Sequence, residues 1–142
     1  MKQPIFTNDP DSGMTHCAIV DKDGNVFCGQ ATCHKDDMDM YSETTGNTIA
    51  LSRATIKYYK YKKKQAETEL KVLERLKDVI RSGKHFDARH FEYRRLLSLL
   101  DEKWDDLQYF KFKIKDIEDT LKEYIDGKEE FYQKIRKLHN KK

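Results

Sequence analysis

The side chains best suited to binding an anionic ligand cluster in residues 89–95, which read Arg-His-Phe-Glu-Tyr-Arg-Arg. Guanidinium groups bind phosphate oxygens in pairs, and the first turn of a helix, where this segment is expected to lie, also attracts anions. The aromatic rings offer stacking faces for a base. The alternative is that the arginines form ion pairs with acidic residues of a neighbouring helix. Six residues are candidate ligand-binding residues: Arg89, His90, Phe91, Tyr93, Arg94 and Arg95.

A second basic segment, residues 57–64, interleaves five lysines with three tyrosines. Lysines neutralise phosphates and tyrosines stack on bases, so one interpretation is a nucleic-acid contact. The alternative is an exposed helical turn in which Tyr59 belongs to the core and the other tyrosines line an oligomer interface, since charge runs are usually solvated. From this segment we add Lys57 to the candidate ligand-binding residues, and we also add Arg53, to which the polar connector of residues 34–47 leads.

A third candidate region is the polar connector of residues 34–47 with its flanks, where hydroxyl, amide and carboxylate side chains are concentrated. Ligand sites often lie in loops that join a sheet to a helix. An ordinary linker would be equally polar, so both interpretations of the connector stay open.

The sequence contains no catalytic signature: it has no phosphate loop, no Gly-x-Ser-x-Gly and no His-Glu-x-x-His. Cys33 and His34 are adjacent, and neighbours in a strand point to opposite faces, so they are not expected to form a thiolate–imidazole pair. Cys28 and Cys33 lack the spacing of a zinc knuckle. We therefore expect a binding protein rather than an enzyme, with no metal and no cofactor.

The composition predicts long helices that are exposed to solvent. The chain has 142 residues, of which 37% are hydrophobic and 37% charged, and its mean hydropathy is −0.92. This length suits a single domain over residues 1–142. No apolar run is long enough to cross a bilayer and the N-terminus has no apolar signal core, so we expect no membrane contact. Three cysteines without such a signal favour free thiols in a reducing cytoplasm.

Charge is distributed unevenly along the chain. Residues 1–46 carry three lysines against eight acids, for a net charge of −5, whereas residues 47–142 carry 25 basic and 17 acidic side chains, for a net charge of +8. A basic helical part favours an anionic ligand, or contact with the acidic N-terminal part, although basic helical surface is commonly only solvated.

The N-terminal part is expected to form a β-hairpin. Residues 1–14 contain both prolines, Pro4 and Pro10, and are expected to be a loosely ordered leader. Residues 15–33 contain two strand-like runs around an Asp-Gly pair at 23–24, which is typical of a tight hairpin turn.

If the Asp-Gly pair is the turn, Val20 pairs with Phe27 and Ile19 with Cys28. One face of the hairpin would then carry Ala18, Val20, Phe27 and Gly29, and the other Cys17, Ile19, Val26 and Cys28. Because both faces are apolar, we expect the hairpin to be covered on both sides. Because two strands alone are marginal, we expect a third strand or a partner chain.

Two long helices are expected after the connector, over residues 47–82 and 87–138, the second with Gly127 as a point where it could break. The first is expected to be capped by Thr45, Asn47 or Thr48. A short loop at 83–86 makes the helices antiparallel, so residues 128–138 should return beside the hairpin. The apolar stripe of the second helix, with Trp104 on its seam, is too long for one partner helix to cover. We therefore expect a homodimer or larger oligomer that assembles through the helices.

Three segments carry a resemblance to a known family: residues 18–34, residues 39–46 and residues 49–54. They resemble the first-described family of phage-encoded Thoeris anti-defence proteins, small sponges that sequester the cyclic ADP-ribose isomer made by that bacterial defence system. The resemblance implies an α+β fold, in which an N-terminal antiparallel sheet is followed by two long helices in a dimer. Some relatives form larger assemblies and hold cyclic oligonucleotides at a second site. The resemblance leaves open whether this chain does the same.

The resemblance implies that the chain binds a cyclic ADP-ribose isomer (gcADPR type) in the cytoplasm of an infected bacterial host and holds it without degrading it. We expect Arg53 with Arg94 or Arg95 to hold the pyrophosphate, and Phe91 or Tyr93 to stack on adenine. Two alternatives remain: a nucleic-acid-binding phage protein that uses residues 57–64, and a helical scaffold or adaptor with no small ligand. No DNA partner is expected if the first interpretation holds.

Overall fold

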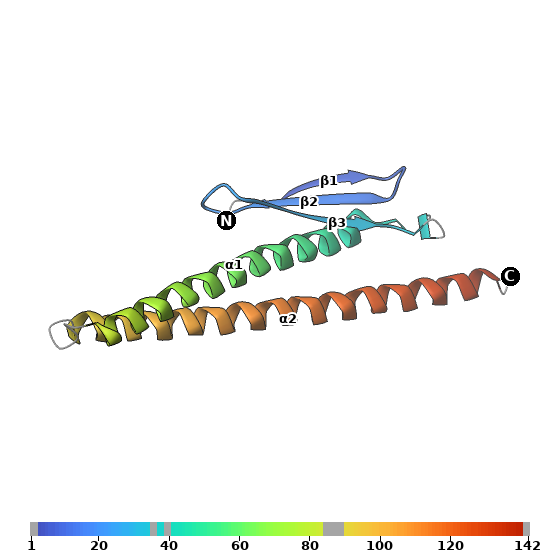
Figure 1. Cartoon of the computed structure of the whole chain (residues 1–142). Coiled ribbons are helices and arrows are strands. Elements are labelled where there is room, and N and C mark those ends of the chain that lie inside the picture. Colours follow the sequence, from blue (N-terminus) through green and yellow to red (C-terminus); the bar gives the residue numbers. More distant parts are fainter. Residues whose placement is uncertain (1–2, 35–36, 39–40, 84–89, 141–142) are drawn as a thin grey trace. The chain divides into compact units, whose positions relative to one another are not determined.

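The structure, a computed structural model, describes residues 3–34, 37–38, 41–83 and 90–140. Three strands come first, and two long helices follow (Figure 1). The elements are β1 (Ile5–Asp9), β2 (Met14–Val20), β3 (Val26–Thr32), α1 (Glu43–Ser82) and α2 (His90–Asn140). The expected α+β architecture, an antiparallel sheet followed by two long helices, is confirmed.

The chain divides into two compact units. The first unit comprises Met1–Tyr58 and Lys115–Lys142, and it holds the sheet, the start of α1 and the end of α2. The second unit, Tyr59–Ile114, holds the rest of both helices. The expectation of a single domain stays a prediction.

The sheet has the order β1-β2-β3, so the hairpin gains the third strand that its marginal size led us to expect. This strand lies within residues 1–14, where the prediction of a loose leader was wrong for residues 5–9. Pro4 and Pro10 flank β1 instead of interrupting it, which leaves its amides free to pair with β2. Gly13, with a φ of 72°, completes the turn between the two strands.

The register of β2 with β3 differs by one residue from the predicted one. Ile19 pairs with Phe27, and Val20 pairs with Val26. The reason is that the loop has three central residues rather than two. Asp21 closes it by accepting hydrogen bonds from the amides of Asp23 and Asn25, each at 2.9 Å, and the left-handed residue that such a loop needs is Gly24, with a φ of 85°.

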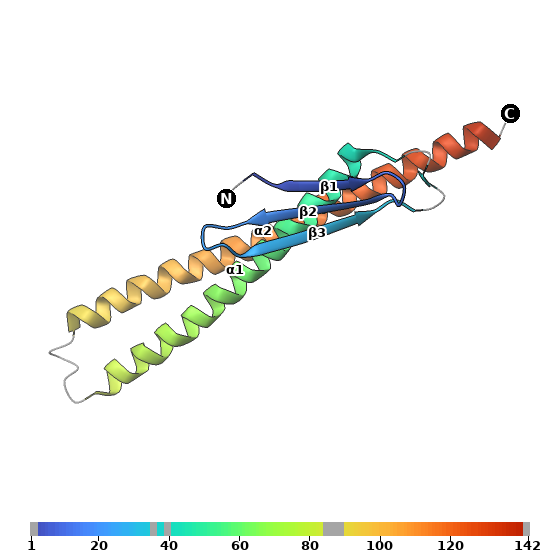
Figure 2. The ribbon, with the colours of Figure 1, turned by 90° about the horizontal axis from the view of Figure 1, so that it is seen from above.

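The corrected register overturns the predicted faces of the hairpin. Cys17, Ile19, Phe27 and Gly29 share the face that packs against α1, and Ala18, Val20, Val26 and Cys28 share the other. Figures 1 and 2 both show the strands lying over the first turns of α1. Within the described chain the second face is uncovered, with Ile5 63% and Val26 58% exposed. The expectation of cover on both sides is therefore not met by the single chain.

The core of the first unit consists of one large and four small side chains on the sheet and on α1: Ile19, and Cys17, Ala31, Ala50 and Ala54. The edge of one ring in the Phe27–Tyr58 pair meets the face of the other, with centroids 5.5 Å apart. These small residues allow the helix backbone to come close to the sheet.

Both helices differ from their predicted bounds. Helix α1 begins at Glu43, four residues earlier than expected. The Ser42 hydroxyl caps it by accepting a hydrogen bond from the amide of Thr45 at 3.3 Å, so the predicted caps were wrong. Helix α2 is continuous to Asn140, and the break considered at Gly127 does not occur. The predicted start at residue 87 and most of the 83–86 loop lie outside the described residues.

The second unit is an antiparallel helix pair. Its core consists of Ala66, Leu70 and Leu107. Tyr59 contacts Tyr109 and Phe110, and Lys103 Nζ lies 2.6 Å from an oxygen of Glu69. Contact partners with higher residue numbers on α1 have lower residue numbers on α2, as antiparallel packing requires.

Trp104 does not lie on the seam of this helix pair, as its spacing had predicted. Its side chain is 55% exposed, whereas Leu107 is 4% exposed and occupies the seam. The stripe of α2 is thus wider than one partner helix can cover, and packing against α1 selects the side that carries Leu107 and Phe110. Among the described residues, no helix is long and apolar enough to span a bilayer.

Candidate functional site

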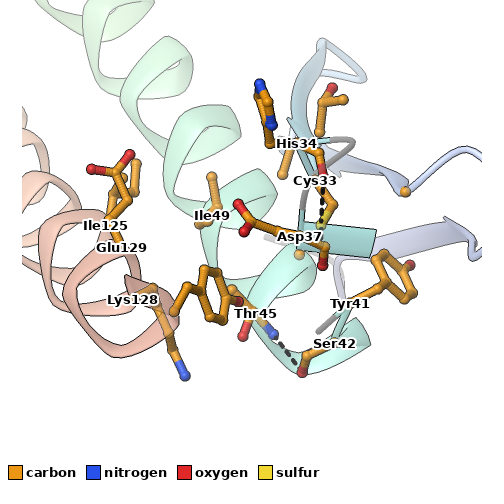
Figure 3. A pocket seen from close by; sticks show the side chains of 15 residues that line it. Cys33, His34, Asp37, Tyr41, Ser42, Thr45, Ile49, Ile125, Lys128 and Glu129 are labelled. Carbon is orange, nitrogen blue, oxygen red and sulfur yellow. Dashed lines mark hydrogen bonds between the residues drawn. The ribbon is translucent and has the colours of Figure 1, made fainter. Parts of the chain in front are cut away.

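A cavity of about 160 Å³ lies within the first unit, where the sheet, the connector and both helices meet (Figure 3). The sheet and its first turn contribute Gly13, Ala31 and Thr32; the connector contributes Cys33, His34, Asp37, Tyr41 and Ser42; α1 contributes Thr45, Gly46 and Ile49; and α2 contributes Ile125, Lys128, Glu129 and Tyr132. The side chains of the connector therefore line a cavity, and its role as a ligand site stays a prediction.

The connector is folded by hydrogen bonds that the chain makes around Cys33. The Cys33 amide donates to the carbonyl oxygen of Gly13 at 2.8 Å, which fixes the connector to the β1–β2 turn. The Cys33 thiol donates to the carbonyl oxygen of Asp37 at 3.3 Å, and the Asp37 amide donates to that of His34 at 2.8 Å. These bonds hold one wall of the cavity in place.

Helix α2 forms the opposite wall. Arg136 makes an ion pair with Asp37, which joins the last turns of α2 to the connector. Burial raises the pKa of Tyr132, nearby Cys33 adds to this effect, and a hydrogen bond with the Thr45 side chain opposes it. Residues 128–138 were expected to return beside the hairpin, and the contacts of Tyr132 and Arg136 place this segment against the connector and the start of α1.

The lining of the cavity combines apolar and hydroxyl groups with charged groups of both signs. Ala31, Ile49 and Ile125 are its apolar members, and the Thr45 and Tyr132 side chains supply hydroxyls. In Figure 3 the Lys128 amine extends away from Ile49 and Asp37, and it lies 5.6 Å from the centre of the Tyr124 ring. Such a cavity can hold an uncharged ring through apolar contact and a few hydrogen bonds.

Tyr41 closes the side of the cavity near the connector. Within the part of the chain that the structure describes, its hydroxyl is buried and has no hydrogen-bond partner. Figure 3 shows this hydroxyl pointing away from α2. Its ring, rather than its hydroxyl, therefore faces the side chains contributed by α2.

Two of the sequence-predicted residues, Arg53 and Lys57, lie on α1 beyond Ile49, and neither of them lines the cavity. Arg53 is one helical turn beyond Ile49, and its Nη1 donates to the carbonyl oxygen of Gln30 at 2.7 Å. Lys57 follows after one more turn, and both side chains are exposed. A guanidinium has five N–H donors, so this one bond leaves Arg53 with capacity for an anion.

The other predicted residues lie at the start of α2, in the second unit. His90, Phe91, Arg94 and Arg95 are exposed there, and Tyr93 is half-buried. Phe91, Arg94 and Arg95 share one helix face because they are three and four residues apart. Arg53 belongs to the first unit, so neither unit contains the whole predicted set. Arg89 lies outside the described residues.

In the basic segment at 57–64, Tyr59 packs inside the chain as the structural alternative predicted, whereas Tyr58 packs on the sheet and not at the predicted oligomer interface. Tyr58 packs on Phe27 of the sheet, and Tyr59 packs on Tyr109 and Phe110 of α2. Of the three tyrosines in this segment, Tyr61 is the exposed one, with 40% of its surface accessible. Two of the three rings proposed for base stacking are therefore engaged within the protein.

Sequence reasoning missed the contribution of α2 to the cavity: Ile125, Lys128, Glu129 and Tyr132. These residues are more than 75 positions from Ile49 in the sequence, and their spacing is that of any amphipathic helix. The available signal was the antiparallel arrangement of the two predicted helices, which returns residues 128–138 toward the beginning of the first helix.

Within the residues that the structure covers, no group of three or more His, Cys, Asp or Glu side chains is arranged to hold a metal ion. Searches against protein-family models, curated proteins and solved structures found no match to this chain.

Proposed function

We propose that the protein binds a cyclic ADP-ribose isomer and sequesters it intact, so that the effector of a bacterial Thoeris system is not activated. The observation that carries this proposal is where the resembling segments lie in the fold. Residues from all three of them line the cavity, including Thr32, Tyr41 and Ile49. The agreement of the fold with the architecture that the resemblance implies adds support.

The phosphates of the ligand would lie along α1, beside the cavity. Ile49, Arg53 and Lys57 follow each other at intervals of four residues, or ~6 Å along a helix. Arg53 offers a fork of donors for a pyrophosphate, and Lys57 adds a second positive charge one turn further along. Arg53 and Lys57 would thus provide positive charge beside the cavity, where the phosphates could bind.

Sequestration requires slow release, and the cavity of one chain is smaller than a typical ligand site. Its volume of about 160 Å³ compares with roughly 300–1,000 Å³ for pockets that enclose drug-sized ligands. We propose that a second copy of the chain completes the enclosure in a homodimer in the host cytoplasm. Arg94 and Arg95 stay in the proposal as candidate contacts.

The decisive experiment incubates the full-length protein with a purified cyclic ADP-ribose isomer, removes free ligand, denatures the protein by heat and analyses the released nucleotide by mass spectrometry. A sponge returns the isomer unchanged and in stoichiometric amount. A hydrolysed product would identify an enzyme, and no retained nucleotide would overturn the proposal.

Arg53→Ala should weaken retention tens- to thousands-fold, since truncating one partner of an enclosed charge pair costs ~2–5 kcal/mol. Lys64→Ala, which removes an exposed lysine elsewhere on α1, is the matched control and should retain the isomer. Equal retention by both variants would remove Arg53 from the site. Strongly salt-dependent binding of long polynucleotides, without binding of the isomer, would favour the nucleic-acid alternative.

A further inference from the structure

The cavity is the right size for one ring system. Its volume of about 160 Å³ is close to the ~150 Å³ of an engineered protein cavity that holds one benzene molecule. This is too little for a dinucleotide and ample for a single base or sugar. Only one part of a dinucleotide-sized ligand, such as its base or one sugar, can therefore enter the cavity.

The charge of the lining argues against a phosphate in this space. Asp37 is neutralised by Arg136, and the amine of Lys128 is directed to the Tyr124 ring. Glu129 is a further carboxylate at the margin. A phosphate enclosed beside two carboxylates, without a cation directed at it, would lose its hydration with little compensation.

The surfaces of the cavity suit a flat, uncharged group. Ile49 on α1 and Ile125 on α2 provide apolar contact from opposite walls, and Figure 3 shows the two side chains on adjacent helices facing the same space. The Thr45 hydroxyl and the phenol of Tyr132 provide hydrogen-bonding groups beside them. A purine has apolar faces and a rim of donors and acceptors, which match this arrangement.

We infer that the cavity binds the purine base of the nucleotide ligand, while the phosphates remain outside it beside Arg53. The identity of the ligand rests on the function proposed above, and the choice of the base rests on the size and charge of the cavity. A nucleoside without phosphate, such as adenosine, is therefore expected to bind this site by itself, with little dependence on salt concentration.

The first test uses the unmodified full-length protein and adenosine. Titration of ¹⁵N-labelled protein should shift the amide signals of Gly13, Cys33, Thr45 and Gly46, which line the cavity. Inorganic pyrophosphate, used as the comparison probe, should leave these signals in place and shift that of Arg53. Adenosine that shifts no cavity signal at millimolar concentration would overturn the inference.

The second test fills the cavity. Ile125→Trp should abolish the adenosine shifts and lower the affinity for a cyclic ADP-ribose isomer on the order of 100-fold, or ~2.7 kcal/mol. Phe131→Trp adds an indole to the same helix at a side chain that is 54% exposed and does not line the cavity, and it should change affinity less than twofold. Circular dichroism checks that both variants keep their helices, and Thr45→Val offers a milder change if Ile125→Trp does not fold.

The outcomes separate the two proposals. Binding of the isomer with equal affinity by the wild type and Ile125→Trp would refute the cavity inference and leave the proposed function intact. Binding of adenosine in the cavity without any binding of the isomer would refute the proposed function and leave the inference intact. Failure of both ligands to bind the wild type would refute both.

Discussion

Gly29 sets how closely the sheet and α1 can approach. A Cβ added at this position would collide with the backbone oxygen of Ala50 and lie 2.5 Å from the amide nitrogen of Ala54. These are backbone atoms of a helix, which cannot move aside as the end of a side chain can. Gly29 therefore has no Cβ at a point where β3 touches the backbone of α1, and this contact places Ile49 and Arg53 relative to β3.

Gly29→Ala should destabilise the protein by about 1–3 kcal/mol, because the added methyl group overpacks a contact with no space. Urea denaturation followed by circular dichroism measures the change. The control is Gly127→Ala in α2, where an added Cβ meets nothing within 4 Å. That variant should gain roughly 0.5–1 kcal/mol from better helix propensity. Equal effects of the two substitutions would show that β3 and α1 are not in close contact.

Tyr132 reports on whether the cavity wall is formed. Burial raises the pKa of its phenol, so the folded state holds this proton more tightly than the unfolded state does. The resulting contribution to stability is complete below the ordinary tyrosine pKa of about 10 and is lost as pH rises through the higher folded-state value.

The melting temperature of the wild type should therefore fall more steeply above pH 10 than that of Tyr132→Phe, which retains the ring and has no ionisable hydroxyl. Differential scanning fluorimetry between pH 8 and 11 compares the two proteins. Tyr61→Phe, which changes an exposed tyrosine, serves as the control and should follow the wild type. Identical slopes for Tyr132→Phe and wild type would show that Tyr132 is solvated.

At the scale of elements, the register of the hairpin decides which side chains reach the core. Cys17 and Cys28 were predicted on one face, and the three-residue loop at 22–24 moves them to opposite faces. Cys17 is 1% exposed and Cys28 is exposed. Burial, with a smaller effect of Cys28, raises the pKa of the Cys17 thiol, which lowers its reactivity further.

Iodoacetamide should therefore modify Cys28 at the rate of a free thiol, while Cys17 reacts only after unfolding. Mass spectrometry of peptides at successive times identifies each site. Denaturation in urea should equalise the two rates and so confirm that structure causes the difference. Similar rates in the native protein would point to the register that the two-residue turn implies.

At the scale of the whole molecule, the helices keep large apolar side chains at the surface of the second unit. Trp104 is 55% and Phe112 63% exposed on α2, and Val72 and Val79 are 55% and 60% exposed on α1. Side chains of this size at regular helical intervals are typical of an interface between chains. They agree with the proposed homodimer.

Light scattering at micromolar concentration should give a mass of at least twice the 16.9 kDa of one chain. Trp104→Ala should shift the protein toward monomer without changing the residues that line the cavity, because an exposed indole contributes to assembly rather than to the core of the chain. Asp105→Ala, at the adjacent exposed position, should leave the mass unchanged. A 16.9 kDa particle for the wild type would contradict the dimer.

The sequence by itself determined the elements with local causes. Apolar side chains at intervals of three and four predict both long helices, and two strand-like runs around an Asp-Gly pair predict the hairpin. The separation of basic residues onto the helices is equally visible, because charge is a property of composition. The sequence did not predict β1, because its five residues gain their stability only by pairing with β2.

Tertiary structure decided the register of the hairpin, the side of α2 that packs and the cavity. The register depends on how Asp21 closes a loop, and one residue more or less reverses every face of the strand. The seam of α2 depends on which part of a wide apolar stripe fits α1. The cavity joins Ile49 to Ile125 and Tyr132, residues that no local pattern connects, because only packing of α2 onto the connector brings them together.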